Sequence, residues 1–421
     1  MRFNIVSETG DGLGFAYRLV TEGEDVRFWV RNADAKSVGD GMVPKVGDLE
    51  DLVHDASPDK DIFVFDVSGN GVVADHLSDR GFEVIGASLL ADRLERDRAF
   101  GTSVMEQCAI KVPPTYSFTD FDDAKQFVEQ NSTVRWVYKP SKQLGDLSAS
   151  HVSYDTEDMV KLLENVQSDV DIENPQFELQ KFIEDAVAVS TELWFSHGTY
   201  IHALTNHTLE RKELMNDNIG PSGGCLGNIV WSCDGCPICV EAKRLIRFAS
   251  AKQYHGMLDL NAIIDKEGSI YGLEFTPRFG YDASPTMYWE LINVPLGEFF
   301  TEFPKASLRN GYASALRVTI PPWPFEKYHA DANVPIRGLP SEDEVYYYNV
   351  KRDKGEVVSA GAWGIICLFI GHASSVSGAF RKPMRYAEEL RLSNKQYRTD
   401  LASQFQKDLV KLSEIFDLEL V

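Results

Sequence analysis

Acidic, amide and hydroxyl side chains recur at alternate positions in two nearby segments of the sequence. Glu274, Thr276 and Arg278 are spaced two residues apart, and so are Asp259 and Asn261. In an extended strand such residues share one face, and a turn between the two segments would pair them as a hairpin. Hard oxygen ligands suit Mg²⁺ or Mn²⁺, and the arginine could meet a phosphoryl group in a transition state. The alternative is an ordinary surface ion pair between Glu274 and Arg278.

A lysine and an extended segment upstream predict a nucleotide site. Lys139 ends a strand-like run, where an ammonium group can meet nucleotide phosphates as a point charge. A later extended segment offers backbone N–H and C=O groups to an adenine edge, and Glu192 beyond it could hold ribose hydroxyls or a metal-bound water. The candidate nucleotide-binding residues of that segment are Glu178, Gln180, Lys181, Phe182 and Ile183. A solvated lysine and a plain edge strand are the structural alternatives.

Strand-like and helix-like runs alternate in residues 1–95, and two glycine-rich turns follow apolar strands. The turns are 9–14 and 66–71, after strands expected at 4–6 and 61–65. This alternation predicts an α/β unit with a parallel sheet, whose ligands bind at the carboxyl ends of the strands.

Two further units are expected, at 96–304 and 305–421. The first of these contains a lid at about 134–205, a helix at 94–108 and an ordered loop at 214–240 that is rich in Gly, Asn, Asp and Cys. The last unit is expected to be α+β. Its expected strands are 315–320 and 365–370, followed by a helix from Tyr397.

Acidic residues outnumber basic ones by 64 to 42, which gives a formal net charge of −22. Such a surface repels phosphate backbones, so general nucleic-acid binding is not expected, although a nucleotide can still bind in a local pocket. No apolar run approaches the roughly 20 residues that cross a bilayer. Glu8 and Asp11 interrupt any signal-peptide core. We expect a cytoplasmic monomer that acts on small molecules and does not bind membranes.

Cys233, Cys236 and Cys239 form a CxxCxxC cluster. Thiolate metal sites usually use four ligands, and no second CxxC pair is present. Cys225 could supply a fourth ligand if a loop folded back. The alternative is a reduced, cysteine-rich loop, and the sequence leaves both possibilities open.

In their order along the chain, these features resemble phosphoribosylamine–glycine ligase, a member of the ATP-grasp superfamily. The most specific signal is the run NIGPSGGCLG at 218–227, which is similar to the family's TGPNTGGMG loop. LEFTPRFG at 273–280 resembles its IEFNxRFG, and KQYRTD at 395–400 resembles its QYRxDI. Lys139 matches its phosphate lysine, and 180–183 match its adenine hinge.

The resemblance implies an ATP-grasp fold with an N-terminal parallel α/β (pre-ATP-grasp) domain and a C-terminal α+β domain. It also implies that ATP and Mg²⁺ convert a carboxylate, glycine in the family, to an acyl phosphate that an amine then attacks. Glu274 and Arg278 would act in catalysis, with Gly223 and Gly224 presenting backbone N–H groups to the reacting carboxylate. The implied metal ligands are Glu274, Thr276, Asp259 and Asn261.

The chain departs from the family in stretches that line the acceptor side. The family reads GGRE, GPE and DPE where this chain has GLGF at 12–15, DVS at 66–68 and YDA at 281–283, and Thr276 replaces an asparagine. Three hypotheses stay open. The first is ligation of glycine to phosphoribosylamine, the second is a divergent ligase with another amine acceptor such as a modified nucleotide, and the third is a non-catalytic nucleotide-binding protein.

Overall fold

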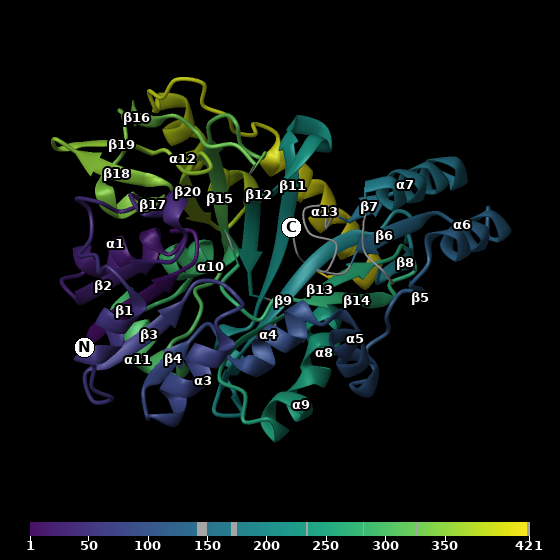
Figure 1. The fold of residues 1–421 in the computed structure, drawn as a ribbon, viewed down its shortest axis with the longest axis horizontal. Coiled ribbons are helices and arrows are strands. Elements are labelled where there is room, and N and C mark those ends of the chain that lie inside the picture. Colours follow the sequence, from purple (N-terminus) through teal and green to yellow (C-terminus); the bar gives the residue numbers. More distant parts are fainter. Residues whose placement is uncertain (141–149, 170–174, 233–234, 281, 326, 419–421) are drawn as a thin grey trace.

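The computed structural model describes residues 1–140, 150–169, 175–232, 235–280, 282–325 and 327–418. Helices and strands form a broad body from which a smaller unit projects on one side (Figure 1). Among the described residues, the strands form four sheets. A search of the same residues finds no helix that is both long enough and apolar enough to cross a membrane.

The N-terminal sheet is parallel and has the strand order β2-β1-β3-β4. All five residues of β3 are buried, as expected for a parallel sheet that is covered on both faces. Its strands are β1 (Arg2–Ser7), β2 (Asp25–Val30), β3 (Asp61–Phe65) and β4 (Glu83–Ile85). The helices of this unit are α1 (Leu13–Thr21), α2 (Leu49–His54), α3 (Gly71–Asp79) and α4 (Leu89–Arg96). The strand order reverses between β1 and β3, and α/β sheets form a ligand crevice at such a point.

The largest sheet has nine strands, and every pairing in it is antiparallel. Its order is β14-β13-β9-β11-β12-β15-β20-β17, with β10 beside β9. The strands are β9 (Val187–Ser196), β10 (Thr199–Tyr200), β11 (Asn206–Met215), β12 (Ile219–Trp231), β13 (Gly256–Ile264), β14 (Ile270–Phe275), β15 (Tyr312–Thr319), β17 (Val345–Tyr347) and β20 (Ile365–Ala373). Because β12 pairs with β15, the sheet runs without interruption from the central unit into the C-terminal unit.

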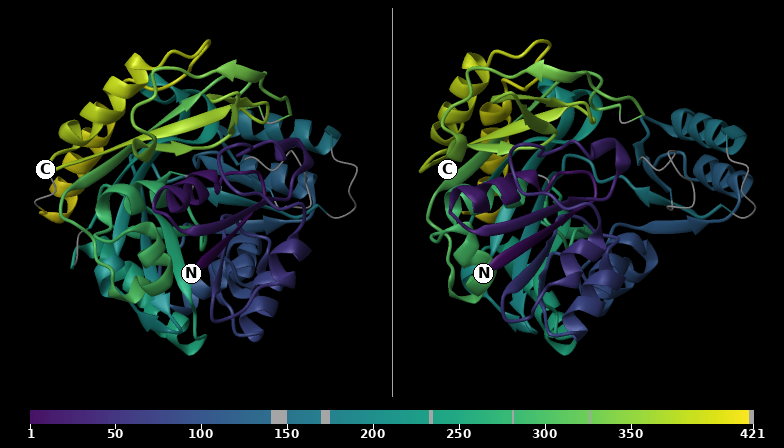
Figure 2. Two further views of the ribbon diagram at one scale, coloured as in Figure 1. Left: turned by 90° about the vertical axis from the view of Figure 1, so that its left-hand side faces the viewer. Right: turned by 60° about the vertical axis from the view of Figure 1, so that its left-hand side comes forward.

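The projecting unit is a four-stranded sheet with two helices (Figures 1 and 2). Its elements are β5 (Thr115–Phe118), β6 (Trp136–Pro140), β7 (His151–Val152), β8 (Phe177–Lys181), α6 (Phe121–Gln130) and α7 (Thr156–Asp169). It has its own small core, in which the rings of Phe121 and Phe177 stack at 4.6 Å. The expected lid at 134–205 includes β9, which lies in the large sheet, and omits β5, which lies in the small one. The domain boundaries near 95 and 305 stay predictions.

A three-stranded antiparallel sheet and the remaining helices complete the molecule. The sheet consists of β16 (Ala332–Pro335), β18 (Val350–Asp353) and β19 (Glu356–Ala360). The helices are α5 (Arg98–Gln107), α8 (Pro237–Ala242), α9 (Ile246–Ala251), α10 (Ala283–Thr286), α11 (Leu296–Glu302), α12 (Val376–Glu389) and α13 (Leu401–Phe416). A π-helical turn, Met287–Leu291, follows α10 directly.

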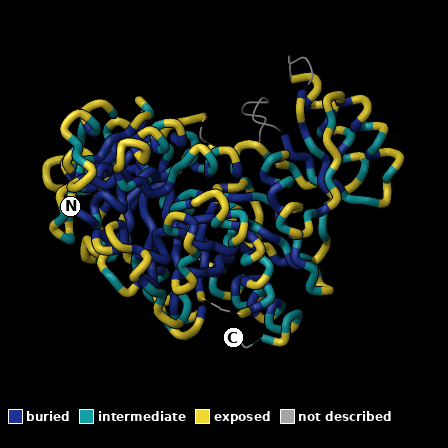
Figure 3. The backbone as a smooth tube through the Cα atoms, turned by 90° about the horizontal axis from the view of Figure 1, so that it is seen from below, coloured by how far each residue is buried: buried dark blue, intermediate teal, exposed yellow. Residues whose placement is uncertain are grey.

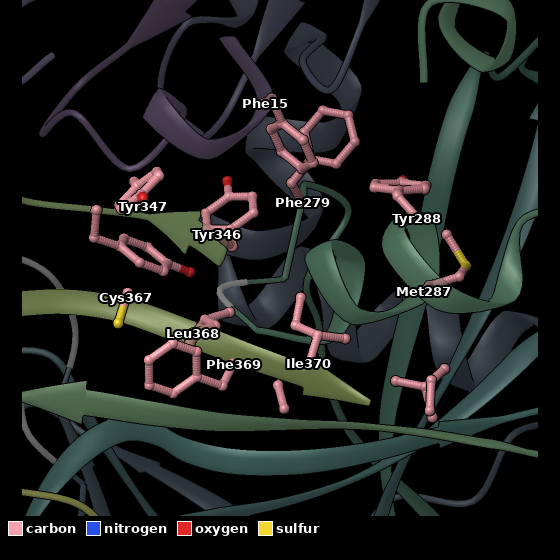
Figure 4. Packing of buried hydrophobic residues seen from close by; sticks show 14 of the residues in the cluster. Phe15, Phe279, Met287, Tyr288, Tyr346, Tyr347, Cys367, Leu368, Phe369 and Ile370 are labelled. Atoms are coloured by element: carbon pink, nitrogen blue, oxygen red, sulfur yellow. The ribbon is translucent and has the colours of Figure 1, made fainter. Parts of the chain in front are cut away.

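Aromatic side chains join the N-terminal unit to the large sheet. The ring centroid of Phe15 in α1 lies 5.1 Å from Phe279, 5.7 Å from Tyr288 and 5.4 Å from Tyr346 in β17 (Figure 4). Buried residues fill the middle of the body, and exposed ones lie at its periphery (Figure 3). Because such rings bury large apolar areas, the two units share one hydrophobic core.

Two expectations about local structure are wrong. The helix expected at 94–108 is two helices, because Asp97 leaves the helical conformation and its side chain caps α5 through Phe100 N–H. The loop expected at 214–240 is largely the strand β12, followed by α8. Residues 227–231 of β12 pair with both β11 and β15, whereas Ile219 and Ser222 pair with β11 alone, across two register shifts.

Candidate functional site

Residues of five neighbouring strands converge on a cavity of about 250 Å³. On β9, β11 and β13 they lie at alternate positions, as the pleat requires, and β12 and the end of β14 complete the lining. The lining residues are Ser190, Glu192, Thr208, Glu210, Lys212, Ser222, Gly224, Cys225, Asp259, Asn261, Glu274, Thr276, Arg278, Gly280 and Ala283. We call this the acid-lined cavity. It brings together the five residues whose alternation predicts a metal and phosphoryl site.

Hydrogen bonds hold the oxygen-bearing side chains of this cavity in place. Thr276 Oγ1 donates to Asp259 Oδ2 at 2.6 Å and accepts from Asn261 Nδ2 at 2.9 Å. The amide nitrogen of Asn261 is therefore committed to Thr276, and its carbonyl oxygen is the atom that remains for a ligand. Burial raises the pKa of Asp259 to about 7, and its Oδ1 is buried without a hydrogen bond to the described residues.

Glu274 and Arg278 lie at the border of the acid-lined cavity. Asn261 and Glu274 are direct neighbours across the β13–β14 pair, and Glu274 Oε2 lies 3.9 Å from Arg98 Nη1. Arg278 Nε lies 3.4 Å from Glu95 Oε1, and its Nη1 donates to Phe279 O at 3.0 Å. The guanidinium of Arg278 is thus held on the side of α4, and the side chain also lines the acid-lined cavity.

Glu192 lies inside the acid-lined cavity and not among the residues around Lys139. Its Oε1 accepts from Trp194 Nε1 at 2.7 Å and from Asn206 Nδ2 at 3.2 Å. Burial raises the pKa of this carboxyl group. Glu192 is the direct neighbour of Asp259 across β9 and β13, so it lies among the residues predicted to bind a metal ion. Its predicted contact with a ribose stays a prediction.

Lys139 lies between the projecting unit and the body. It is 8% exposed and, with Glu178, lines a cleft of about 690 Å³ and a neighbouring pocket of about 20 Å³. Burial lowers the pKa of Lys139 to about 8, against the opposing effect of Glu274. Glu274 also lines the smaller pocket, as do Gln180 and Arg98. The predicted nucleotide residues and the acid-lined cavity therefore meet at Glu274.

Two N–H groups of the predicted adenine hinge, residues 180–183, already donate to carbonyl oxygens of the chain. Lys181 N–H donates to Pro114 O at 2.8 Å, and Phe182 N–H donates to Arg135 O at 2.9 Å. The guanidinium of Arg135 lies 4.3 Å from the ring centre of Phe182. These two N–H groups are consequently not available to an adenine edge. Ile183 is the last of the predicted hinge residues, and its role stays a prediction.

The glycines predicted to bind the reacting carboxylate lie on β12. Gly224 has φ +77°, lines the acid-lined cavity and has open space where a Cβ would stand. Gly223 is buried, and its carbonyl oxygen accepts a hydrogen bond from Arg317 Nη1 at 3.2 Å. Arg317 is 1% exposed and forms an ion pair with Asp282, which is 0% exposed. This buried ion pair holds the backbone at Gly223 in place.

Several lining residues were not predicted as site residues. Glu210 and Lys212 on β11 face the cavity, and Arg98 lines the pocket of Lys139. Cys225, predicted only as a possible thiolate ligand, also lines the cavity. The alternation of Thr208, Glu210 and Lys212 was the available signal for β11. Arg98 gave no such signal, because it lies on a helix whose orientation only the tertiary structure defines.

The cysteine cluster lies away from these pockets. Cys233 lies outside the described residues. Cys236 and Cys239 are buried, and Cys236 Sγ accepts from Cys239 N–H at 3.5 Å and lies 3.4 Å from His207 Nε2. Metal binding by this cluster stays a prediction.

In the described part of the chain, three potential metal-ligand atoms do converge elsewhere, at Glu83, His197 and His255. There, Glu83 Oε1 lies 2.8 Å from His255 Nε2, and His255 Nδ1 accepts from His197 N–H at 3.3 Å. These contacts of His255 connect β4 to the β9–β10 turn.

Comparison with known proteins gives a curated relative at low identity. No family model matches the sequence. Over 351 residues the chain is 22% identical to the bifunctional purine biosynthetic protein PUR2,5 of Pichia angusta, a match that covers 79% of this chain and 43% of that protein. The chain thus spans less than half of the length of this relative.

Solved structures match over almost the whole chain. Phosphoribosylamine–glycine ligase from Thermotoga maritima superposes with a TM-score of 0.70 at 16% identity, covering 95% of this chain and 100% of that one. The biotin carboxylase domain of the 2-oxoglutarate carboxylase from Hydrogenobacter thermophilus, solved with MgADP, ADP and bicarbonate, gives 0.65 at 15% identity, covering 97% and 98%. This chain therefore has the ATP-grasp fold, and over most of its length it resembles phosphoribosylamine–glycine ligase.

Proposed function

We propose that this protein is an ATP-dependent carboxylate–amine ligase. A carboxylate oxygen of the first substrate attacks the γ-phosphorus of ATP, ADP leaves and an acyl phosphate forms. The nitrogen of an amine then attacks the acyl carbon, inorganic phosphate leaves and the nitrogen loses a proton, which completes an amide. The observation that carries this proposal is the position of Glu274, which lines both the pocket of Lys139 and the acid-lined cavity. Phosphoryl transfer requires such a junction between a nucleotide site and an acceptor site.

The residues at this junction have distinct roles in the proposal. Lys139 and Arg98 bind the phosphates of the nucleotide, and the low exposure of Lys139 strengthens its charge interaction with them. Arg278 faces the transferring phosphoryl group, where charge develops in the transition state. Gly224 has a positive φ and open space where a Cβ would stand, which lets the substrate carboxylate approach the backbone of β12 closely.

The oxygen atoms of the acid-lined cavity fit a divalent cation. Glu274, Asp259 and the carbonyl oxygen of Asn261 are hard donors, and Asp259 Oδ1 lacks a hydrogen bond among the described residues. Thr276 Oγ1 is engaged with both Asp259 and Asn261, so it orients these ligands and is a weaker ligand itself. A bound Mg²⁺ or Mn²⁺ would neutralise charge on the phosphates.

Two acceptor amines are compatible with this chemistry. The names of the relatives favour glycine as the carboxylate and phosphoribosylamine as the amine. The altered stretches at 12–15 and 66–68 favour a different amine. In either case we propose small-molecule substrates and a cytoplasmic monomer.

The test is ADP release from ATP and Mg²⁺ in the presence of glycine, with and without each amine. Carboxylate-dependent ADP release that disappears in Glu274→Gln would support the ligase. ATP binding measured by calorimetry, without ADP release under any combination of carboxylates and amines, would refute it and favour a non-catalytic nucleotide-binding protein.

A further inference from the structure

The loops that follow β1 and β3 meet where the strand order of the parallel sheet reverses. Open α/β sheets bind ligands at this edge, and the N-termini of the helices there attract phosphate groups. In this chain, α1 begins after the first loop and α3 begins after the second. The start of α1 lies near the acid-lined cavity, because Phe15 of α1 packs at 5.1 Å on Phe279, which stands between the lining residues Arg278 and Gly280.

The N-terminus of α1 is already occupied by a carboxylate of the chain. Asp66 Oδ2 accepts from Gly12 N–H at 2.8 Å and from the hydroxyl of Ser7, and Asp66 Oδ1 accepts from Glu8 N–H at 3.3 Å. Ser7 Oγ in turn accepts from Gly10 N–H at 2.9 Å. Asp66 is 5% exposed, so its carboxyl group is buried between the ends of β1 and β3. The N–H groups of Gly10, Gly12 and Leu13 in this turn therefore already have acceptors within the chain.

The N-terminus of α3 is occupied in the same way by Asp92 of α4. Gly69 N–H donates to Asp92 Oδ1 at 2.5 Å, and Gly71 N–H donates to Asp92 Oδ2 at 2.7 Å. Two oxygens of one acidic group bound by two backbone N–H groups is the arrangement by which such a loop binds a phosphate. The side chain of Asp92 thus takes the place that a phosphate of a substrate would need.

Two arginines lie near these loops. Arg31 Nη1 lies 3.0 Å from Glu8 Oε2, and its Nη2 donates to Asn70 Oδ1 at 2.5 Å. Arg96 lies against Gly69, where a Cβ would come within 2.2 Å of its Nη1. Neither arginine frees the N–H groups that Asp66 and Asp92 occupy. A phosphate group that bound here would therefore have to displace one of these two carboxyl groups.

We propose that the acceptor of this ligase is an amine that carries no phosphate group, because Asp66 and Asp92 already occupy backbone N–H groups of both loops. This inference rests on the proposed ligase function and specifies its second substrate.

The first experiment compares two amines that differ only in the phosphate. Freshly made ribosylamine and phosphoribosylamine are each added to the enzyme with ATP, Mg²⁺ and glycine, alongside ethanolamine, putrescine and glucosamine, and ADP release is measured. We expect at least one phosphate-free amine to stimulate release more than phosphoribosylamine does. Stronger stimulation by phosphoribosylamine than by every phosphate-free amine would overturn the proposal.

The second experiment measures the phosphate site directly. Ribose 5-phosphate is titrated by calorimetry into the wild-type protein and into Asp92→Ala, each saturated with MgADP so that the nucleotide site is filled. We expect binding at least about tenfold tighter in the variant, because Gly69 and Gly71 regain free N–H groups. Equal or tighter binding in the wild type would show that the phosphate site is open, which contradicts the proposal.

Matched variants keep this measurement interpretable. Asp75→Ala removes a neighbouring carboxylate, which accepts from Leu89 N–H at 3.2 Å, and it is expected to leave the affinity for ribose 5-phosphate unchanged. If Asp92→Ala does not fold, Asp92→Asn removes the charge with almost the same shape. Absence of any ATP-dependent reaction would refute the ligase function, whereas the affinities for ribose 5-phosphate would still report on the crevice.

Discussion

Binding of ATP at pH 8 and above is expected to bring a proton onto Lys139. Burial lowers the pKa of this lysine from 10.5 to about 8, a cost of about 3 kcal/mol for keeping the ammonium charged. Phosphates beside the nitrogen would restore the charged form. Before ATP binds, the pKa of about 8 leaves the group about 10% deprotonated at pH 7, about 50% at pH 8 and about 90% at pH 9.

The expected proton uptake is therefore about 0.1 proton at pH 7, about 0.5 at pH 8 and about 0.9 at pH 9. The affinity for ATP should be nearly constant below pH 8 and should fall about tenfold per pH unit above it. In the ATP-free protein, the free energy of unfolding should rise between about pH 8 and pH 10.5, because the unfolded chain holds the proton more tightly there.

Calorimetry in buffers of different ionisation enthalpy measures this uptake directly. Lys139→Arg stays charged and should bind ATP without taking up a proton, whereas Lys139→Gln should bind ATP weakly at every pH. Lys161, whose side chain is 64% exposed on α7, supplies the control, and Lys161→Gln should behave as the wild type. Uptake of less than about 0.2 proton at pH 9, or the same uptake in Lys139→Arg, would refute this account.

Three further predictions concern the metal ligand, the buried ion pair and a buried acid. Glu274→Gln should lower the rate of ADP release at least about 100-fold and barely change the melting temperature, since the side chain is 44% exposed; a normal rate would exclude Glu274 as a metal ligand. Arg317→Met should lower the free energy of unfolding by about 3–5 kcal/mol in urea titrations, because Asp282 stays buried without its partner. The surface control Arg337→Met, 63% exposed, should cost under about 1 kcal/mol, and equal losses in the two variants would contradict the assignment. Burial raises the pKa of Asp66 from 3.8 to about 7, so stability should fall as pH rises through that window. Asp66→Asn should flatten this fall, and an unchanged pH profile would show that another group causes it.

The local pattern of the sequence predicted the strands and their faces well. The alternation of Glu274, Thr276 and Arg278, and of Asp259 and Asn261, correctly placed these side chains on one face, because the period of a strand is a property of the backbone. Applied to Thr208, Glu210 and Lys212, the same rule would have predicted that these side chains also share one face of a strand. The ATP-grasp fold, inferred from the order of motifs, is confirmed by the superposed structures.

Local propensity failed where tertiary pairing overrode it. The glycines of 220–227 predicted a loop, but β11 pairs with this segment at Ser222 and Gly227, and β15 pairs with it from Gly227 onwards, so it is part of a strand. The break at Asp97 was also missed, because a capping carboxylate can begin a helix wherever packing turns the chain.

By itself, the sequence determined which groups recur in one pattern: a lysine at the end of a strand, oxygen-bearing side chains at alternate positions, and an arginine beside them. Only the tertiary structure decided how these groups combine. It placed Glu192 beside Asp259 on a neighbouring strand, brought Arg98 from a helix to Lys139, and filled two helix N-termini with Asp66 and Asp92. The reason is that residue type and spacing act along one strand or one helix, whereas a hydrogen bond between residues such as Gly12 and Asp66 depends on how distant segments pack.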